Sequence, residues 1–190
     1  DGGMQEKIAI RTDLLIQANH LSFEEMAIVE PLAIGAHALR RANVQKGESI
    51  VVIGCGPIGI GLMKLAQIKG AEVIALDLDD ARLEFVKKEI GVKHTVKVTD
   101  SAVEDVSKIT NGDLAAAVFD ATGNKRALES GTNYMSHGGR YVLVGLSKGE
   151  LTFSHPAIHA KESTIMCSRN ATLEDFEFVI DHLDTFPTTE

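Results

Sequence analysis

The chain has 190 residues, a formal net charge of −8, 44% apolar residues and 5% aromatic residues. The length allows one α/β domain with a sizeable core. The negative charge argues against binding to nucleic acid or to an anionic membrane surface, and no apolar run is long enough to cross a bilayer.

The sequence contains two cysteines, Cys55 and Cys167. They form no CxxC pair, which excludes a cysteine-rich structural metal site. So few cysteines in a chain of this length are typical of a reducing compartment. We therefore expect the protein to be cytoplasmic and both thiols to be free.

The first 45 residues carry few structural signals. Lys7–Ile10 alternates like a short strand, a helical region opens over Leu21–Met26, and residues 30–42 predict a second helix with Pro31 at its first position. One strand and two helices cannot bury an independent core. We therefore expect residues 1–45 to be a connector, including an interdomain helix, from a domain outside this chain.

Apolar, strand-like runs alternate with helical stretches between residues 46 and 170. Such alternation is typical of parallel strands joined by helical crossovers. The sequence therefore predicts an α/β fold with a doubly wound, six-stranded parallel sheet of the Rossmann type. The six expected strands are Ser49–Ile53, Glu72–Asp77, His94–Val98, Ala115–Asp120, Arg140–Gly145 and Ser163–Cys167.

A glycine motif follows the first expected strand and opens a helix. Its spacing, Gly54-x-Gly56-x-x-Gly59, is the fingerprint of dinucleotide binding in this context. Gly54 allows a sharp turn, Gly56 lets the backbone approach a pyrophosphate, and Gly59 lets the helix pack closely on the strand. The helix N-terminus would offer free N–H groups and a positive dipole end to the phosphates.

An acidic residue closes the second expected strand. Asp77 stands 18 residues after Gly59, where a carboxylate can hold both ribose hydroxyls and would repel a 2′-phosphate. Gly54–Asp77 therefore predicts an NAD site rather than an NADP site. The alternative is a tight glycine turn in an α/β protein that binds no ligand.

The last twenty residues predict one more helix. Thr172 is suited to be its N-cap, and Glu174 and Asp175 would lie in its first turn. We expect residues 171–190 to be the start of a C-terminal helical return segment. Because the sequence begins at Asp1 without a methionine and stops at Glu190 without a capped element, we expect a piece of a longer protein.

Further motifs occur in a fixed order along the chain, and together they resemble the cofactor-binding half of zinc-dependent medium-chain alcohol and polyol dehydrogenases. The branch they resemble contains sorbitol, threonine and sugar-acid dehydrogenases. The motifs are Glu30-Pro31-Leu32-Ala33, Gly47-Glu48, residues 52–59, Asp77 with Arg82-Leu83, Asp120-Ala121-Thr122-Gly123, Gly138-Gly139-Arg140, Val144-Gly145-Leu146 and Ser168-Arg169-Asn170.

The resemblance implies that NAD is the cofactor and assigns residues to it. The glycine turn would cradle the pyrophosphate, Asp77 would hold the adenine ribose, and the loops after the fourth and fifth strands would border the nicotinamide. The residues implied to contact NAD are Gly54, Gly56, Pro57, Ile58, Gly59, Asp77, Arg82, Thr122, Gly123, Val144, Gly145, Leu146 and Arg169. The alternatives are a solvated helix charge for Arg82 and a surface ion pair for Arg169.

The resemblance also gives Glu30 a role. In the polyol-type relatives, the glutamate of this Glu-Pro motif reaches the catalytic zinc or its bound water. The alternative is a first-turn acid stabilised by the helix dipole. The cysteine and histidine ligands are implied to lie in an N-terminal catalytic domain outside this chain, so we expect no complete zinc site here and no catalysis by this chain alone.

The histidine pair His155 and His159 has the i,i+4 spacing of a helix face. It lacks the glutamate of an HExxH motif, so we expect a polar helix rather than a metal site.

The implied reaction transfers a hydride from a secondary alcohol to NAD; the alcohol would be a polyol, a sugar acid or an amino-alcohol acid such as threonine. The zinc of the longer protein would act as a Lewis acid that lowers the pKa of the substrate hydroxyl. Relatives pair through the edge of the sixth strand, so we expect a homodimer or a tetramer through Ser163–Cys167.

Two other functions stay open on the sequence. One is a stand-alone NAD-binding module without catalysis, and the other is a methyltransferase, which also uses a glycine turn and an acid after the second strand. A short-chain dehydrogenase is disfavoured, because neither Tyr134 nor Tyr141 is followed by lysine four residues later.

Overall fold

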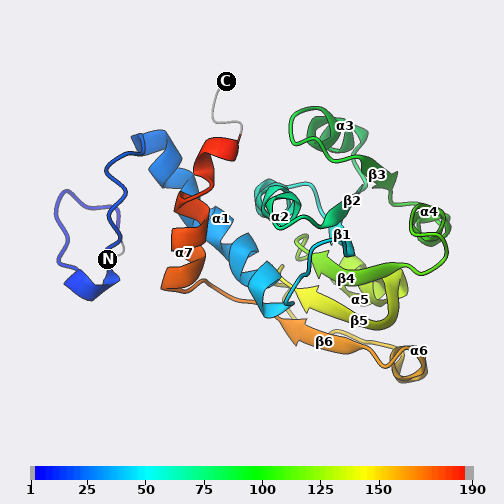
Figure 1. The fold of residues 1–190 in the computed structure, drawn as a ribbon. Coiled ribbons are helices and arrows are strands. Elements are labelled where there is room, and N and C mark those ends of the chain that lie inside the picture. Colours follow the sequence, from blue (N-terminus) through cyan, green and yellow to red (C-terminus); the bar gives the residue numbers. More distant parts are fainter. Residues whose placement is uncertain (1–2, 187–190) are drawn as a thin grey trace.

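Six parallel strands form the centre of the fold, in the order β3-β2-β1-β4-β5-β6 (Figure 1). This order is that of a doubly wound sheet with its switch point between β1 and β4, and it confirms the predicted fold class. The computed structural model describes residues 3–186; residues 1–2 of the expected connector and 187–190 of the expected return segment lie outside the described residues. The strands are β1 (Ser49–Ile53), β2 (Glu72–Asp77), β3 (His94–Lys97), β4 (Ala115–Asp120), β5 (Met135–Leu143) and β6 (Thr164–Cys167).

The fifth strand differs from its prediction, whereas the other five begin and end within one residue of theirs. β5 starts at Met135, which pairs with Ala115 ahead of an irregularity in the register. Two glycines follow, and their poor strand propensity hid this first half. β5 ends at Leu143 rather than Gly145, because the next two N–H groups both donate to the carbonyl of Asp120.

Helices cover both faces of the sheet. One buried cluster joins α1, α2, α3 and α7 to one face, and a second joins α4 and the turn before β5 to the other (Figure 1). α5 lies on this second face, where the Tyr141 hydroxyl donates to the Leu128 carbonyl at 2.7 Å. The helices are α1 (Phe23–Arg41), α2 (Pro57–Ile68), α3 (Asp80–Lys88), α4 (Ala102–Ile109), α5 (Lys125–Ser130), α6 (His155–Ala160) and α7 (Leu173–Ile180). Short 3₁₀ turns span Thr12–Leu14, Gly131–Tyr134 and Leu183–Thr185.

The N-terminal helix is longer than predicted. α1 runs without interruption through Pro31, so the expected second helix starting at that proline is wrong. Ser22 and Glu25 form a capping box that fixes the true start. The proline removes one backbone hydrogen bond and strains the preceding turn, but the buried face of α1 against α2 and the sheet, from Val29 to Ala42, holds the helix together.

The expected strand over Lys7–Ile10 is also wrong. These residues are exposed and belong to no helix or strand, and no strand of the described part of the chain pairs with them. Alternation alone does not make a strand when no sheet edge accepts the backbone.

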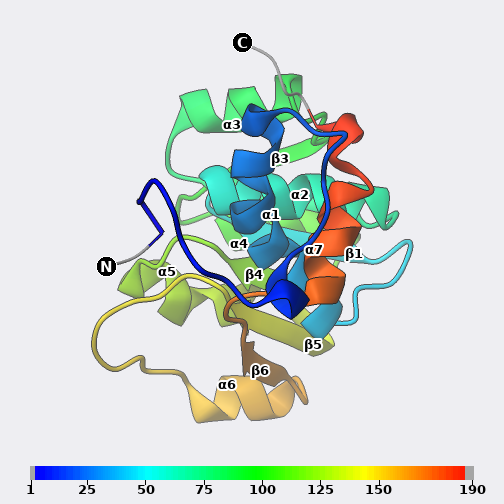
Figure 2. The ribbon, with the colours of Figure 1, turned by 90° about the vertical axis from the view of Figure 1, so that its left-hand side faces the viewer.

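A buried carboxylate joins the first α-helix of the fold to the last. Figure 2 shows α1 and α7 side by side in front of the sheet. Asp175 of α7 is 2% exposed and accepts hydrogen bonds from Arg40 Nε at 2.8 Å and from the Thr172 N–H at 2.8 Å. His37 Nδ1 lies 2.8 Å from the same carboxylate. Thr172 and Asp175 form the capping box of α7, which confirms the predicted N-cap.

Asp175→Ala is expected to lower the free energy of unfolding by about 3 kcal/mol, because Arg40 and His37 lose their shared acceptor. The matched control is Glu174→Ala, which removes only an exposed ion pair to Arg40 at 3.5 Å and should cost less than about 1 kcal/mol. Chemical denaturation of both variants measures the difference. Equal losses of unfolding free energy in the two variants would show that the buried carboxylate stabilises the fold no more than the exposed one.

The same residue makes stability depend on pH. Burial by itself would raise the pKa of Asp175, but hydrogen bonds from Arg40, Thr172 and His37 outweigh it and hold the pKa well below its ordinary value. A carboxyl with a depressed folded-state pKa adds stability that is fully present above its unfolded pKa of about 4. That stability is lost as the pH falls from there through the folded-state pKa. Between about pH 5 and pH 3, the wild type should therefore lose more stability than Asp175→Ala.

Candidate functional site

The glycine turn between β1 and α2 has the geometry that its motif requires. Gly54 has φ +100°, and its N–H donates to the Leu76 carbonyl at 2.7 Å. Gly59 packs directly on this turn: a Cβ at that position would lie 1.8 Å from the Gly54 oxygen. The close approach of α2 to β1 therefore depends on a glycine in the helix.

The start of α2 leaves room for an anionic ligand. A Cβ at Gly56 would meet nothing within 4 Å, so the backbone there faces open space. Gly56 is the N-cap of α2 and supplies no side-chain cap, and Pro57 follows it. The first N–H groups of a helix have no acceptor within it. Open space beside free N–H groups at a helix N-terminus is the arrangement that fits the pyrophosphate of a dinucleotide.

Asp77 joins the glycine turn to the end of β2. Its side chain is buried, and Oδ2 accepts the buried N–H of Cys55 at 2.7 Å while Oδ1 accepts the N–H of Asp79 at 3.0 Å. Each carboxylate oxygen can accept a further hydrogen bond, so ribose hydroxyls can still bind. Besides its predicted contact with the ribose, Asp77 therefore binds the glycine turn itself through Cys55, which sequence reasoning missed.

Cys55 lies within the turn, and its buried side chain is not a reactive thiol. It is 3% exposed, and burial, together with the nearby charge of Asp77, raises its pKa to about 12. The neutral thiol is a poor nucleophile. Cys55 and Cys167 are both free, as the sequence predicts.

The loops after β4 and β5 meet at the same end of the sheet. Their backbones are in direct contact, since a Cβ at Gly145 would lie 2.2 Å from the Gly123 nitrogen. Asp120, at the end of β4, is fully buried and accepts the Thr122 N–H at 2.8 Å. Burial raises the pKa of Asp120 against the opposing effect of hydrogen bonds from Thr122 and Gly123.

Two apolar side chains are exposed next to these loops and strands. Leu146 is 93% exposed just after β5, and Leu78 is 72% exposed directly after Asp77. The resemblance predicts Leu146 as a cofactor contact.

The two predicted arginines lie at the surface of the described chain. Arg82, in α3, and Arg169, after β6, are exposed, and neither is ion-paired with any residue from 3 to 186. The surface ion pair considered for Arg169 is therefore wrong within these residues, and both guanidinium groups can meet a ligand.

Glu30 is exposed on α1, two turns after the helix begins. The alternative of a first-turn acid stabilised by the helix dipole is therefore wrong. His155 and His159 lie on α6 with ring centroids 5.6 Å apart, as the spacing predicts. In the described part of the chain, no three residues among His, Cys, Asp and Glu are grouped so that they could hold a metal ion. Glu30, His155 and His159 therefore do not form a zinc site with other residues of the described part of the chain.

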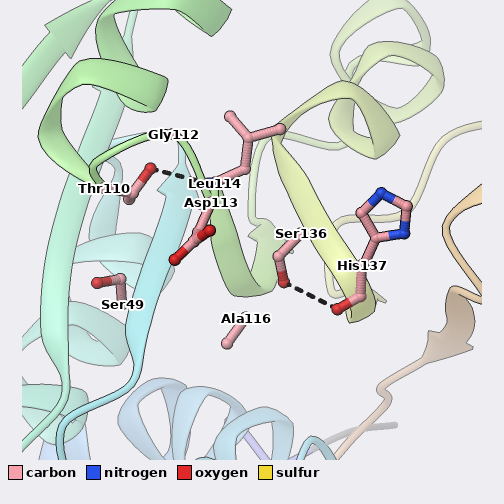
Figure 3. Close-up of a pocket in the computed structure, with 8 residues that line it drawn as sticks. All are labelled: Ser49, Thr110, Gly112, Asp113, Leu114, Ala116, Ser136 and His137. Atoms are coloured by element: carbon pink, nitrogen blue, oxygen red, sulfur yellow. Dashed lines mark hydrogen bonds between the residues drawn. The ribbon is translucent and has the colours of Figure 1, made fainter.

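A separate hollow of about 470 Å³ lies at the opposite, amino-terminal end of the strands (Figure 3). None of the residues predicted to contact NAD lines it. It is lined by Ser49, Thr110, Gly112, Asp113, Leu114, Ala116, Ser136 and His137. Ligands of open α/β sheets bind at the carboxyl ends of the strands, so this hollow is on the wrong side for a dinucleotide.

No helix within residues 3–186 is long and apolar enough to span a membrane.

Comparisons with known proteins agree with this geometry. The sequence model of the family described as zinc-binding dehydrogenase matches residues 57–185. L-galactonate-5-dehydrogenase of Escherichia coli K12 is 42% identical over 180 residues, 93% of this chain and 52% of that protein. Sorbitol dehydrogenase of Bacillus subtilis is 34% identical over 169 residues, 87% of this chain and 48% of that protein.

Solved structures share the fold. Acetophenone reductase from Geotrichum candidum, solved in complex with NAD, superposes with a TM-score of 0.80 at 22% identity, covering 92% of this chain and 49% of that one. The chain spans about half the length of the curated relatives it matches. The alternative of a methyltransferase is not supported, because the matched family and the relatives named here are dehydrogenases. The chain belongs to the zinc-binding dehydrogenase family, of which it covers the C-terminal, cofactor-binding half.

Proposed function

We propose that this chain is the NAD-binding part of a zinc-type dehydrogenase that oxidises a secondary alcohol of a polyol or sugar acid. The observation that carries the proposal is the joint geometry of Gly56 and Asp77. Gly56 leaves open space at the uncapped start of α2, and Asp77 closes β2 with a carboxylate that a 2′-phosphate would meet unfavourably. The NAD bound to the acetophenone reductase supports the same cofactor.

Each half of the site would serve one half of the cofactor. Asp77 and Arg82 would bind the adenosine side, with the pyrophosphate at Gly54, Gly56, Pro57, Ile58 and Gly59. The loops at Thr122, Gly123, Val144, Gly145 and Leu146 would hold the nicotinamide side, and Arg169 would approach the cofactor or the substrate. When bound, NAD supplies the carbon that accepts the hydride; this chain's residues bind and orient it.

The division of the chain belongs to the proposal too. Residues 1–45 would connect to a catalytic domain, residues 46–170 would form the NAD-binding domain, and residues 171–190 would begin a helical return. The catalytic zinc would be held by that other domain, with Glu30 reaching toward the metal or its water. The substrate class follows the names of the relatives, L-galactonate-5-dehydrogenase and sorbitol dehydrogenase.

The exposed edge of β6 would pair with a second copy, giving a homodimer or tetramer in the cytoplasm. β6 is an outer strand of the sheet, and an unpaired edge is a natural site for strand addition.

Calorimetric titration of the chain with NAD, NADP and S-adenosylmethionine tests the cofactor. We expect saturable heat with NAD alone, at a dissociation constant of roughly 1 mM, because the other wall of the site would come from the catalytic domain. Binding at roughly micromolar NAD would instead support a stand-alone NAD-binding module. Heat with S-adenosylmethionine alone, or no heat with any ligand, would contradict the proposal.

A further inference from the structure

The carboxyl end of β4 contains a carboxylate that the proposed NAD contacts do not include. Asp120 is 0% exposed, and its Oδ1 accepts three hydrogen bonds. The donors are the Thr122 N–H at 2.8 Å, the Thr122 hydroxyl at 2.8 Å and the Gly123 N–H at 3.3 Å. One oxygen atom therefore fixes the whole turn that follows β4.

The same residue also fixes the loop after β5. Its backbone carbonyl accepts the N–H of Val144 at 3.0 Å and the N–H of Gly145 at 2.8 Å. The two loops leave no space between them, because a Cβ at Gly123 would lie 2.9 Å from the Leu146 oxygen. The loops after β4 and β5 are thus held as one unit through Asp120.

The other carboxylate oxygen of Asp120 is buried at a cost to the stability of the fold. Asp120 Oδ2 is buried and has no hydrogen-bond partner among the described residues. Leaving such a group unpaired is unfavourable, and an unsatisfied buried polar atom in a native structure calls for an explanation. The geometry offers one explanation: the three donors need an acceptor at the position of Oδ1, and the carboxylate that supplies it brings Oδ2 with it.

The position of Asp120 relative to Asp77 indicates which half of the cofactor it serves. β2 and β4 lie on either side of β1, so the two acids close strands on opposite sides of the switch point. A dinucleotide lies across that point, with one mononucleotide half over each side. With the adenosine half at Asp77, the nicotinamide half lies over the ends of β4 and β5.

We infer that Asp120 is a positioning residue that holds the loops after β4 and β5 in the shape that receives the nicotinamide ring. The inference rests on the proposed function, since it takes NAD as the ligand. Asp120 acts through Thr122, Gly123, Val144 and Gly145 rather than by touching the cofactor itself.

The test compares NADH with ADP-ribose, which has every part of the cofactor except the nicotinamide. Binding of both to the chain is measured by calorimetry, and the fluorescence of bound NADH reports the ring's surroundings. Asp120→Ala should weaken NADH at least tenfold and move its emission toward that of free NADH, while ADP-ribose stays within twofold. Asp120→Asn keeps one acceptor oxygen and should stay within about threefold of wild type for both ligands.

Asp113→Ala is the matched control, because it removes an exposed carboxylate just before the other end of β4. It should change neither ligand. If Asp120→Ala does not fold, Asp120→Ser, which replaces the carboxylate by a shorter hydroxyl side chain, should weaken NADH and leave ADP-ribose within twofold. Equal losses for NADH and ADP-ribose, or no loss for either, would overturn the inference. A wild-type chain that binds neither ligand would contradict the proposed function itself, and the inference with it.

Discussion

Gly59→Ala is expected to lower the free energy of unfolding by about 3 kcal/mol or more. The added methyl group would lie 1.8 Å from the Gly54 oxygen and 3.0 Å from its carbonyl carbon. Because the obstacle is backbone rather than the flexible end of a side chain, either α2 moves away from β1 or the turn opens. Chemical denaturation against the wild type measures the loss.

Gly56→Ala is the matched control for this prediction. Nothing lies within 4 Å of the new Cβ, and the backbone at φ −85° and ψ −178° is open to alanine. Stability should change by less than about 1 kcal/mol. NAD binding should weaken at least about tenfold, since the methyl group would stand where the pyrophosphate approaches. A Gly59→Ala protein as stable as wild type would contradict the packing, and unchanged NAD binding by Gly56→Ala would contradict the phosphate site.

Asp77→Ser is expected to weaken NAD binding by about tenfold or more and to shift the NAD-to-NADP affinity ratio toward NADP. The ribose loses a charged acceptor, and a 2′-phosphate no longer meets a carboxylate. The variant should also lose about 1–3 kcal/mol of stability, because the buried Cys55 N–H loses its acceptor at 2.7 Å. Titration with both cofactors well below the unfolding temperature separates the two effects.

Glu72→Ser serves as the control for Asp77. It removes an exposed acidic side chain from the opposite end of the same strand. The ratio of NAD to NADP affinity should stay at its wild-type value. If the Asp77→Ser protein is folded and its ratio of NAD to NADP affinity is also unchanged, Asp77 does not bind the ribose hydroxyls.

The sequence predicted six parallel strands joined by helices, because each buried strand is a short apolar run between helical stretches. β1, for instance, buries every residue from Ile50 to Ile53, so its run of apolar letters is continuous. The glycine turn was equally readable, since φ +100° at Gly54 and the contact at Gly59 both require glycine. The prediction failed at β5, where two glycines weaken the local signal of a strand that its neighbours nevertheless hold.

The candidate site was only partly readable. Asp77 was found by its spacing from the glycine turn, but its bond to Cys55 was not, because the two residues are 22 positions apart. Asp120 carries a similar signal, an acid at the end of a buried strand, yet its hydrogen bonds and its burial depend on how the following loops fold back on it.

The sequence by itself determined the features that depend on neighbours within a turn or a strand. These are the alternation of strands and helices, the glycine spacing, and the capping box at Thr172. The tertiary structure decided the contacts between distant residues. Pro31 is tolerated inside α1 because the buried face of that helix packs against α2 and the sheet. Asp175 accepts a hydrogen bond from Arg40 across 135 positions. Arg140 of β5 binds Glu48, just before β1, across 92 positions, and it also donates to the Ala42 carbonyl at the end of α1. Local patterns cannot predict such pairs, because the fold as a whole brings them within hydrogen-bond distance.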